Sequence, residues 1–118
     1  MIYDLEERTA NFGENVLDFV KTLKRDVINL SLIKQLIRSA TSVGANYCEA
    51  NQASSRRDFL SKIGICRKEA NESKYWLRML VKTDAKLKER CANLWKESHE
   101  LVLIFSKIAN NTKSRLEI

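Results

Sequence analysis

The chain of 118 residues contains no proline and only three glycines, Gly13, Gly44 and Gly64. Average usage of about 5% would give roughly six prolines in a chain of this length. Sheets need many tight turns, and glycine and proline supply the backbone conformations of those turns. The sequence therefore predicts an all-helical protein, and its length predicts a single domain over residues 1–118.

Long apolar runs are also missing, and none approaches the ~20 residues that a membrane-spanning helix needs. The first residues, MIYDLEER, are acidic where a secretory signal would be basic. We therefore expect a cytoplasmic protein. The three cysteines, Cys48, Cys66 and Cys91, lack CxxC spacing, which predicts small buried thiols and argues against disulfides or a zinc site.

Four segments place apolar or small residues at alternating steps of four and three, the pattern of a helix with one buried face. These apolar stripes are Leu5-Thr9-Phe12-Val16-Phe19-Leu23, Ile33-Leu36-Ala40-Val43-Tyr47-Ala50, Phe59-Ile63-Cys66-Ala70-Ser73-Leu77-Leu80 and Leu87-Cys91-Leu94-Ser98-Leu101-Phe105-Ile108. They predict helices over about 4–24, 31–51, 55–82 and 85–112. Because the connections are short, the predicted fold class is all-α, an antiparallel up-down-up-down four-helix bundle.

Polar residues at the predicted helix starts are candidate N-caps. Asn29 or Ser31 is expected to cap the second helix. Ser55 is followed three residues later by Asp58, the spacing of a capping box, at the start of the third helix. Thr83 and Asp84 are the candidates for the fourth.

Some large apolar residues lie off the stripes, and Ile65, Trp76 and Trp95 are in surplus of what a small core needs. Surplus apolar surface on a small bundle commonly marks a subunit interface. The sequence therefore predicts a homo-oligomer with these three residues at its interface. A scaffold that recognises another protein through Trp76 or Trp95 is an alternative.

The net charge of +6 is concentrated in the middle of the chain. Residues 1–20 carry one basic and five acidic side chains, whereas residues 21–91 carry sixteen basic and seven acidic ones. A basic region suggests a polyanionic partner such as RNA, although basic charge can also serve solubility alone.

Basic side chains that could follow a phosphate backbone recur on the second and third predicted helices. The candidate nucleic-acid-binding residues are Lys34, Arg38, Arg56, Arg57, Arg67, Lys74, Arg78 and Lys82. The alternative is a solvated face whose charges form salt bridges with Glu69, Glu72 and Asp58.

Candidate catalytic groups are few. His99 is the only histidine, so a di-iron site of the Glu-x-x-His type is excluded, and a solvated or helix-capping role is expected for it. Two Glu-x-x-Glu pairs, Glu69 with Glu72 and Glu97 with Glu100, could face each other and hold magnesium, as in an all-α nucleotide pyrophosphatase.

Flanking lysines favour a simpler interpretation of these carboxylates. Lys68, Lys74 and Lys96 are expected to form salt bridges with them, and Glu69 and Glu72 are expected beside the core stripe. The sequence thus predicts a non-enzymatic protein without catalytic residues, metal or cofactor, and keeps the magnesium-dependent hydrolase as the alternative.

The runs QLIRSATSVGANYCEA (35–50) and SSRRDFLSKIGICRKEANESKYWLRML (54–80), with the opening phrase DLEERTANFGENVLDFVK, resemble a known family. It comprises four-helix-bundle proteins encoded in intervening sequences of bacterial 23S rRNA genes. The resemblance covers nearly the whole chain and implies a left-handed up-down bundle that assembles as a barrel-like homopentamer.

A sister group of that family is the accessory protein of diversity-generating retroelements, in which a basic pentamer binds a reverse transcriptase and RNA. The resemblance therefore implies RNA or a reverse transcriptase as partner, and it carries no catalytic residue. Residues at the motif positions are Arg38, Asn46, Glu49, Phe59, Glu69, Glu72 and Trp76. We expect the polar ones to form hydrogen bonds between helices or subunits, because buried charge must be paired.

Overall fold

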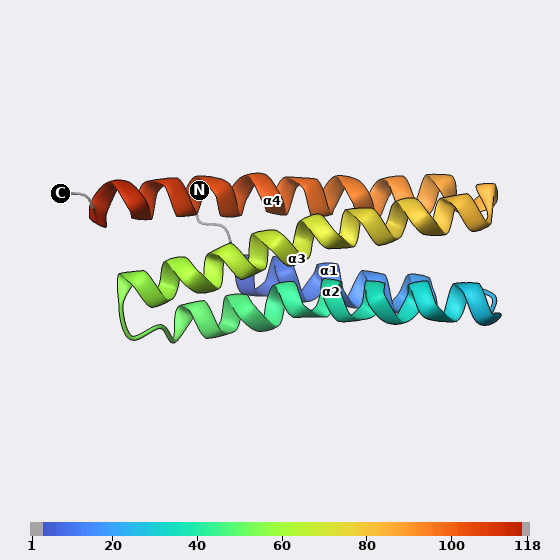
Figure 1. Cartoon of the computed structure of the whole chain (residues 1–118), viewed down its shortest axis with the longest axis horizontal. Coiled ribbons are helices and arrows are strands. Elements are labelled where there is room, and N and C mark those ends of the chain that lie inside the picture. Colours follow the sequence, from blue (N-terminus) through green and yellow to red (C-terminus); the bar gives the residue numbers. More distant parts are fainter. Residues whose placement is uncertain (1–3, 117–118) are drawn as a thin grey trace.

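The computed structural model describes residues 4–116, which form helices and the connections between them. Four long helices run alternately in opposite directions in an elongated bundle of 51 × 22 × 21 Å (Figure 1). The elements are α1 (Leu5–Val20), α2 (Val27–Asn51), α3 (Arg56–Thr83), a 3₁₀ turn η1 (Ala85–Leu87) and α4 (Lys88–Leu116). The predicted all-α, up-down-up-down bundle is confirmed.

Aspartate side chains cap the first two helices. Asp4 accepts a hydrogen bond from the backbone N–H of Glu7 at 3.1 Å, and Asp26 accepts one from Asn29 at 2.8 Å. The prediction that Asn29 or Ser31 caps the second helix is therefore wrong. The carboxylate of Asp26 lies about one turn before the predicted caps and accepts from a free backbone N–H there, so α2 begins at Val27. Asn29 therefore lies inside the helix and is buried.

The cap predicted for α3 is confirmed. The hydroxyl of Ser55 accepts from the backbone N–H of Asp58 at 3.0 Å, and the carboxylate of Asp58 accepts from the backbone N–H of Ser54 at 3.3 Å. Of the two candidates before the last helix, Asp84 accepts from the N–H of Lys86 at 3.0 Å and begins η1. Thr83 instead donates to a carbonyl of its own helix.

Two helix ends differ from the expectation. α1 ends at Val20, before the expected residue 24, yet Leu23 beyond its end is still buried against the core. α4 continues to Leu116, past the expected residue 112, and is the longest helix at 29 residues. Even so, between residues 4 and 116 no helix is long and apolar enough to cross a membrane.

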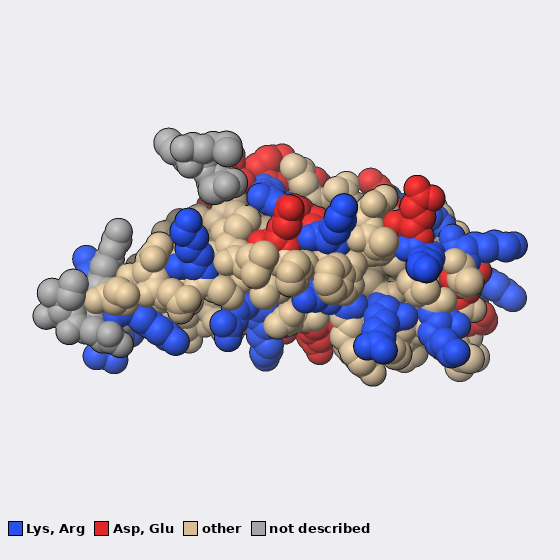
Figure 2. Space-filling model, turned by 90° about the horizontal axis from the view of Figure 1, so that it is seen from above, with Lys and Arg blue, Asp and Glu red and all other residues tan. Residues whose placement is uncertain are grey.

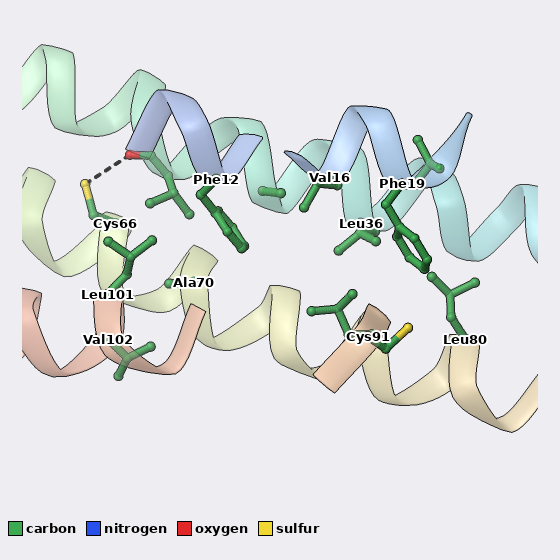
Figure 3. Close-up of a cluster of buried hydrophobic side chains, with 14 of the residues drawn as sticks. Phe12, Val16, Phe19, Leu36, Cys66, Ala70, Leu80, Cys91, Leu101 and Val102 are labelled. Atoms are coloured by element: carbon green, nitrogen blue, oxygen red, sulfur yellow. Dashed lines mark hydrogen bonds between the residues drawn. The ribbon is translucent and has the colours of Figure 1, made fainter. Parts of the chain in front are cut away.

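The core lies where the four apolar stripes meet, and every stripe residue is buried or half-buried. Helix α2 packs against α3 and α3 against α4, while α1 lies against α2 and α4. Figure 3 shows Phe12 and Phe19 of α1 pointing into the space between α1 and the helices opposite it, where Leu101 of α4 also lies. Phe12 and Leu101 are at most 1% exposed, so little water reaches this core.

Candidate nucleic-acid interface

An open groove of about 510 Å³ lies between the second half of α3 and the first half of α4. Its lining residues, which we call the α3–α4 groove, are Leu77, Arg78, Val81, Lys88, Cys91, Ala92, Asn93, Trp95 and Lys96. On α4, Lys88, Cys91 and Trp95 follow one another at steps of three and four, so they form one stripe along the groove. The lining includes three basic side chains and, among these described residues, no acidic one.

Trp95 stands at one end of this groove and is 39% exposed. Its indole stacks on the His99 ring with centroids 5.1 Å apart and 16° between the planes. The ammonium of Lys74 on α3 lies 4.6 Å from the Trp95 ring centroid and 3.0 Å from Nδ1 of His99. Because an ammonium can only donate, Nδ1 of His99 accepts the hydrogen bond in this contact. The solvated or capping role expected for His99 is corrected to a place in this cluster.

The structure brings only some of the predicted basic residues to the groove. Arg78 lines it, Lys74 contacts Trp95 beside it, and Arg67 and Lys82 are exposed on the same helix. Figure 2 views the α4 face, on which basic side chains gather along the lower edge and at the end where α4 begins, and acidic ones mainly along the upper edge.

The other predicted basic residues lie elsewhere. Arg56 and Arg57 are exposed at the opposite end of α3, about 30 Å from Arg78 at 1.5 Å per residue. Lys34 and Arg38 lie on α2, which packs against α3 but does not line the groove.

Arg38 is engaged inside the fold. Its guanidinium donates to Glu69 at 2.8 Å and also to Glu72, and both carboxylates belong to α3. These contacts, first the hydrogen bond to Glu72, raise the pKa of Arg38. Glu69 was expected beside the core, but its side chain is only 7% exposed, so it is a buried carboxylate neutralised by an arginine from the neighbouring helix.

A second arginine, which is not among the predicted site residues, repeats this contact. Arg8 of α1 donates through Nε and Nη2 to Glu97 of α4 at 2.9 and 2.8 Å, and through Nη2 to Glu100 at 2.6 Å. The hydrogen bond to Glu97 is the main cause of a raised Arg8 pKa. One signal was available, because Arg8 is the only basic residue in the acidic first twenty.

These arginines correct two expectations for the carboxylate pairs. Their partners are arginines from other helices, in place of the expected lysines at 68, 74 and 96. The α3 pair faces α2 and the α4 pair faces α1, so the two pairs do not face each other. Among residues 4–116, no group of three or more His, Cys, Asp or Glu side chains is placed to hold a metal ion. The geometry thus gives the magnesium-dependent hydrolase no support.

The three residues predicted at an oligomer interface lie on two different faces. Ile65 and Trp76 flank Glu69 and Glu72 at steps of four, three and four, so they share the side of α3 that faces α2. Trp95 instead lines the α3–α4 groove. Trp76 is half-buried, and its ring packs edge-on against Tyr75 with centroids 5.0 Å apart.

The remaining motif positions have structural roles. Glu49 of α2 forms an ion pair with Lys62 of α3 at 3.6 Å, which fits the expected contact between helices. Asn46 does not, because its amide donates to the backbone and hydroxyl oxygens of Ser42 within α2. Phe59 is half-buried and packs against the core.

The cysteines are free thiols, and two of them are buried as predicted. Burial raises the pKa of Cys66 to about 12 and that of Cys91 to about 11, so neither is a reactive thiolate near neutral pH. Cys48 is exposed, which corrects the expectation of a buried thiol.

Fold and groove together define an all-α bundle with an open, basic, tryptophan-containing surface. The sequence profile of the 23S rRNA-intervening sequence protein family matches residues 3–107, and the chain belongs to this family. The chain is also similar to a solved protein of unknown function from the S23 ribosomal protein family of Bacteroides thetaiotaomicron VPI-5482. The two are 34% identical, with a TM-score of 0.79 over 88% of this chain and 96% of the other. None of the curated proteins matches the chain.

Proposed function

We propose that this protein binds RNA through the α3–α4 groove and the exposed basic residues of α3, without catalysing a reaction. The observation that supports the proposal is that, among the residues that the structure describes, the basic side chains lining the groove form no ion pair. Between residues 4 and 116, the ion pairs use Arg8, Lys21, Arg38 and Lys62.

Several exposed basic side chains that form no ion pair among residues 4–116 lie on α3 and α4. Arg78, Lys88 and Lys96 line the groove, and the helical spacing of Arg67 and Lys82 places them on the side of α3 that carries Arg78. A nucleic acid that these cations contact releases its condensed counterions, which supplies affinity without base recognition. A strand that follows α3 away from the groove reaches Arg56 and Arg57 at the far end.

Salt dependence of RNA binding tests this proposal. Contacts to about four phosphates predict that affinity for a labelled RNA falls roughly 50-fold between about 50 and 200 mM salt. The double variant Arg67→Glu with Arg78→Glu should abolish binding. As a matched control, Lys107→Glu with Lys113→Glu makes the same charge change on exposed residues further along α4 and should retain most of the affinity. Affinity that is insensitive to salt and to the first variant would overturn the proposal.

We further propose that the chain forms a homo-oligomer, five-fold as the resemblance implies, through the face of α3 that carries Ile65 and Trp76. Both residues lie where α3 packs against α2 but stay half-buried, and Tyr75, which contacts Trp76, is 53% exposed, so the part of this face that α2 leaves uncovered offers apolar surface to a second copy. Light scattering behind a sizing column should give five times the 13.7 kDa of one chain.

Substitution and added RNA sharpen the same measurement. Ile65→Glu should reduce the mass toward that of one chain, whereas Leu103→Glu, an exposed apolar residue of α4, should not. Mass that increases with added RNA would support both proposals. An oligomer indifferent to RNA would favour a protein partner, such as the reverse transcriptase that the resemblance implies, and a monomer would overturn the assembly.

A further inference from the structure

Trp95 has one covered face. The ammonium of Lys74 lies over the indole, 4.6 Å from its centroid, and the His99 ring stacks on the indole at 5.1 Å. Groups in contact with opposite faces of a ring are separated by about 7 Å, twice the van der Waals contact distance of roughly 3.5 Å. Lys74 and His99 are only 3.0 Å apart, so both lie on the same face of the indole.

The other face of the indole borders the groove. His99 follows Trp95 by four residues and Cys91 precedes it by four, so the two lie on opposite sides of Trp95 along one stripe of α4. Cys91 lines the groove and His99 does not. The stack with His99 therefore fixes the plane of the indole and leaves its second face toward the groove.

The charges around that face suit a phosphate chain. Arg78, Lys88 and Lys96 line the same groove, and no acidic side chain is among its described lining residues. The nearest carboxylate pair of α4, Glu97 with Glu100, is bound by Arg8 on the α1 side of the helix. A base on the indole would thus have cations beside its flanking phosphates and no carboxylate among the described residues that line the groove.

We propose that Trp95 is a stacking platform for an unpaired base of RNA, with Arg78, Lys88 and Lys96 contacting the phosphates on either side of it. The inference rests on the proposed RNA binding and narrows its ligand to single-stranded segments. An indole face can stack a base only when that base is free of its own duplex stack, and every base has a face to offer. Lys74 and His99 act as positioning residues behind the ring.

Binding of a labelled single-stranded RNA of about a dozen nucleotides, compared with a duplex of the same length, tests the platform. Truncating a stacking aromatic costs about 1–3 kcal/mol per base, so Trp95→Ala should weaken single-strand binding roughly 5- to 150-fold. Trp95→Phe keeps an aromatic face and should recover most of the affinity. Duplex binding should change little with either variant. Leu103→Ala, which removes an exposed apolar side chain of α4 outside the groove and the proposed oligomer interface, is the control.

A spectroscopic measurement covers the case in which a variant fails to fold. In the Trp76→Phe background, Trp95 is the remaining tryptophan, and saturation with the single strand should quench its emission. Unchanged emission would overturn the platform. So would wild-type affinity in Trp95→Ala, or a loss of oligomer mass in that variant with RNA affinity retained.

Comparing the two variants separates a loss of base stacking from a loss of RNA binding. If Arg67→Glu with Arg78→Glu abolishes binding while Trp95→Ala binds both RNAs as the wild type does, phosphate contacts carry the affinity and only the stacking role is lost. If the wild-type protein binds neither RNA at low salt, both proposals are wrong.

Discussion

The α2–α3 pair and the α1–α4 pair of helices use the same ionic contact at different depths. In each, an arginine of the first helix binds two glutamates spaced three apart on the second. Glu69 of the α2–α3 pair is 7% exposed, whereas Glu97 of the α1–α4 pair is 30% exposed. Identical residue types thus meet in a water-poor and in a water-accessible setting.

Other polar contacts follow the same division. Between α2 and α3, the hydroxyls of Ser39 and Ser73 are buried 2.8 Å apart, and the Cys66 thiol donates to the Val43 carbonyl at 3.5 Å (Figure 3). Between α1 and α4, the exposed Arg90 lies over an α1 aromatic ring at 5.1 Å. From this comparison we expect water access, more than residue type, to set the contribution of a polar contact to stability.

The largest loss of stability is expected for a substitution at Arg38. Arg38→Ala leaves Glu69 buried without its partner, and breaking a buried pair in this way typically costs about 3–5 kcal/mol. Because the Arg38 side chain is itself 47% exposed, water can partly replace it, and we expect a loss of about 2–3 kcal/mol in the free energy of unfolding. Urea unfolding followed by circular dichroism measures this loss.

A second substitution shows whether the unpaired charge is the cause. Arg38→Ala with Glu69→Gln removes the buried charge as well as its partner, so it should be more stable than Arg38→Ala alone. A loss below about 0.5 kcal/mol in Arg38→Ala, the range of ordinary surface substitutions, would contradict the water-poor setting of the α2–α3 pair.

Cys66 gives a pH-dependent test of the same setting. Burial raises its pKa from 9.0 to about 12, so above pH 9 the thiol ionises in the unfolded chain while it stays protonated in the folded one. Stability from this group is complete below pH 9 and decreases as pH rises toward 12. The expected loss at about pH 10 is about 1.4 kcal/mol.

The measurement is the slope of unfolding free energy against pH, compared between variants. Cys66→Ala should have a shallower decline above pH 9 than the wild type, whatever its own stability. Cys48→Ala removes an exposed thiol and serves as the matched control. Parallel slopes for the wild type and Cys66→Ala would show that water reaches this part of the α2–α3 pair.

The fold was predictable because its cause is local and repeated. Each apolar stripe predicts the buried face of one helix. Because the connections are short, consecutive helices can only pack as antiparallel neighbours. The start of α2 was not predictable, because Asp26, Asn29 and Ser31 are all residue types that cap helices well. The choice among them depends on which free N–H groups lie within reach.

The candidate site was only partly predictable. Periodicity along α3 predicted that Arg67, Lys74 and Arg78 lie on one side of the helix. It could not predict which residues of the neighbouring helices face them. Which carboxylates meet which cations depends on how neighbouring helices are rotated about their axes, so Arg38 was assigned to RNA although it binds two glutamates of α3. The cluster around Trp95 contains residues of two helices, α3 and α4, and no spacing within the sequence predicts this contact.

The smallest loss of stability is expected for a substitution at Arg8. Its size tests whether the burial of the glutamates explains the difference between the two arginines. Arg8→Ala removes a contact of the same chemistry as the one at Arg38, but water can solvate Glu97 and Glu100, which are 30% and 63% exposed. Exposed ion pairs contribute about 0.2–1 kcal/mol, and the two-pronged geometry at Glu97 favours the upper end, about 1 kcal/mol.

The salt dependence of the stability loss should also differ between the Arg8 and Arg38 variants. In about 1 M salt, where the screening length is about 3 Å, the cost of Arg8→Ala should shrink, while that of Arg38→Ala should change little because its buried partner is poorly screened. Urea unfolding at low and high salt measures both. Equal costs for the two variants, or equal salt sensitivity, would mean that the depth of these contacts in the bundle does not set their contribution to stability.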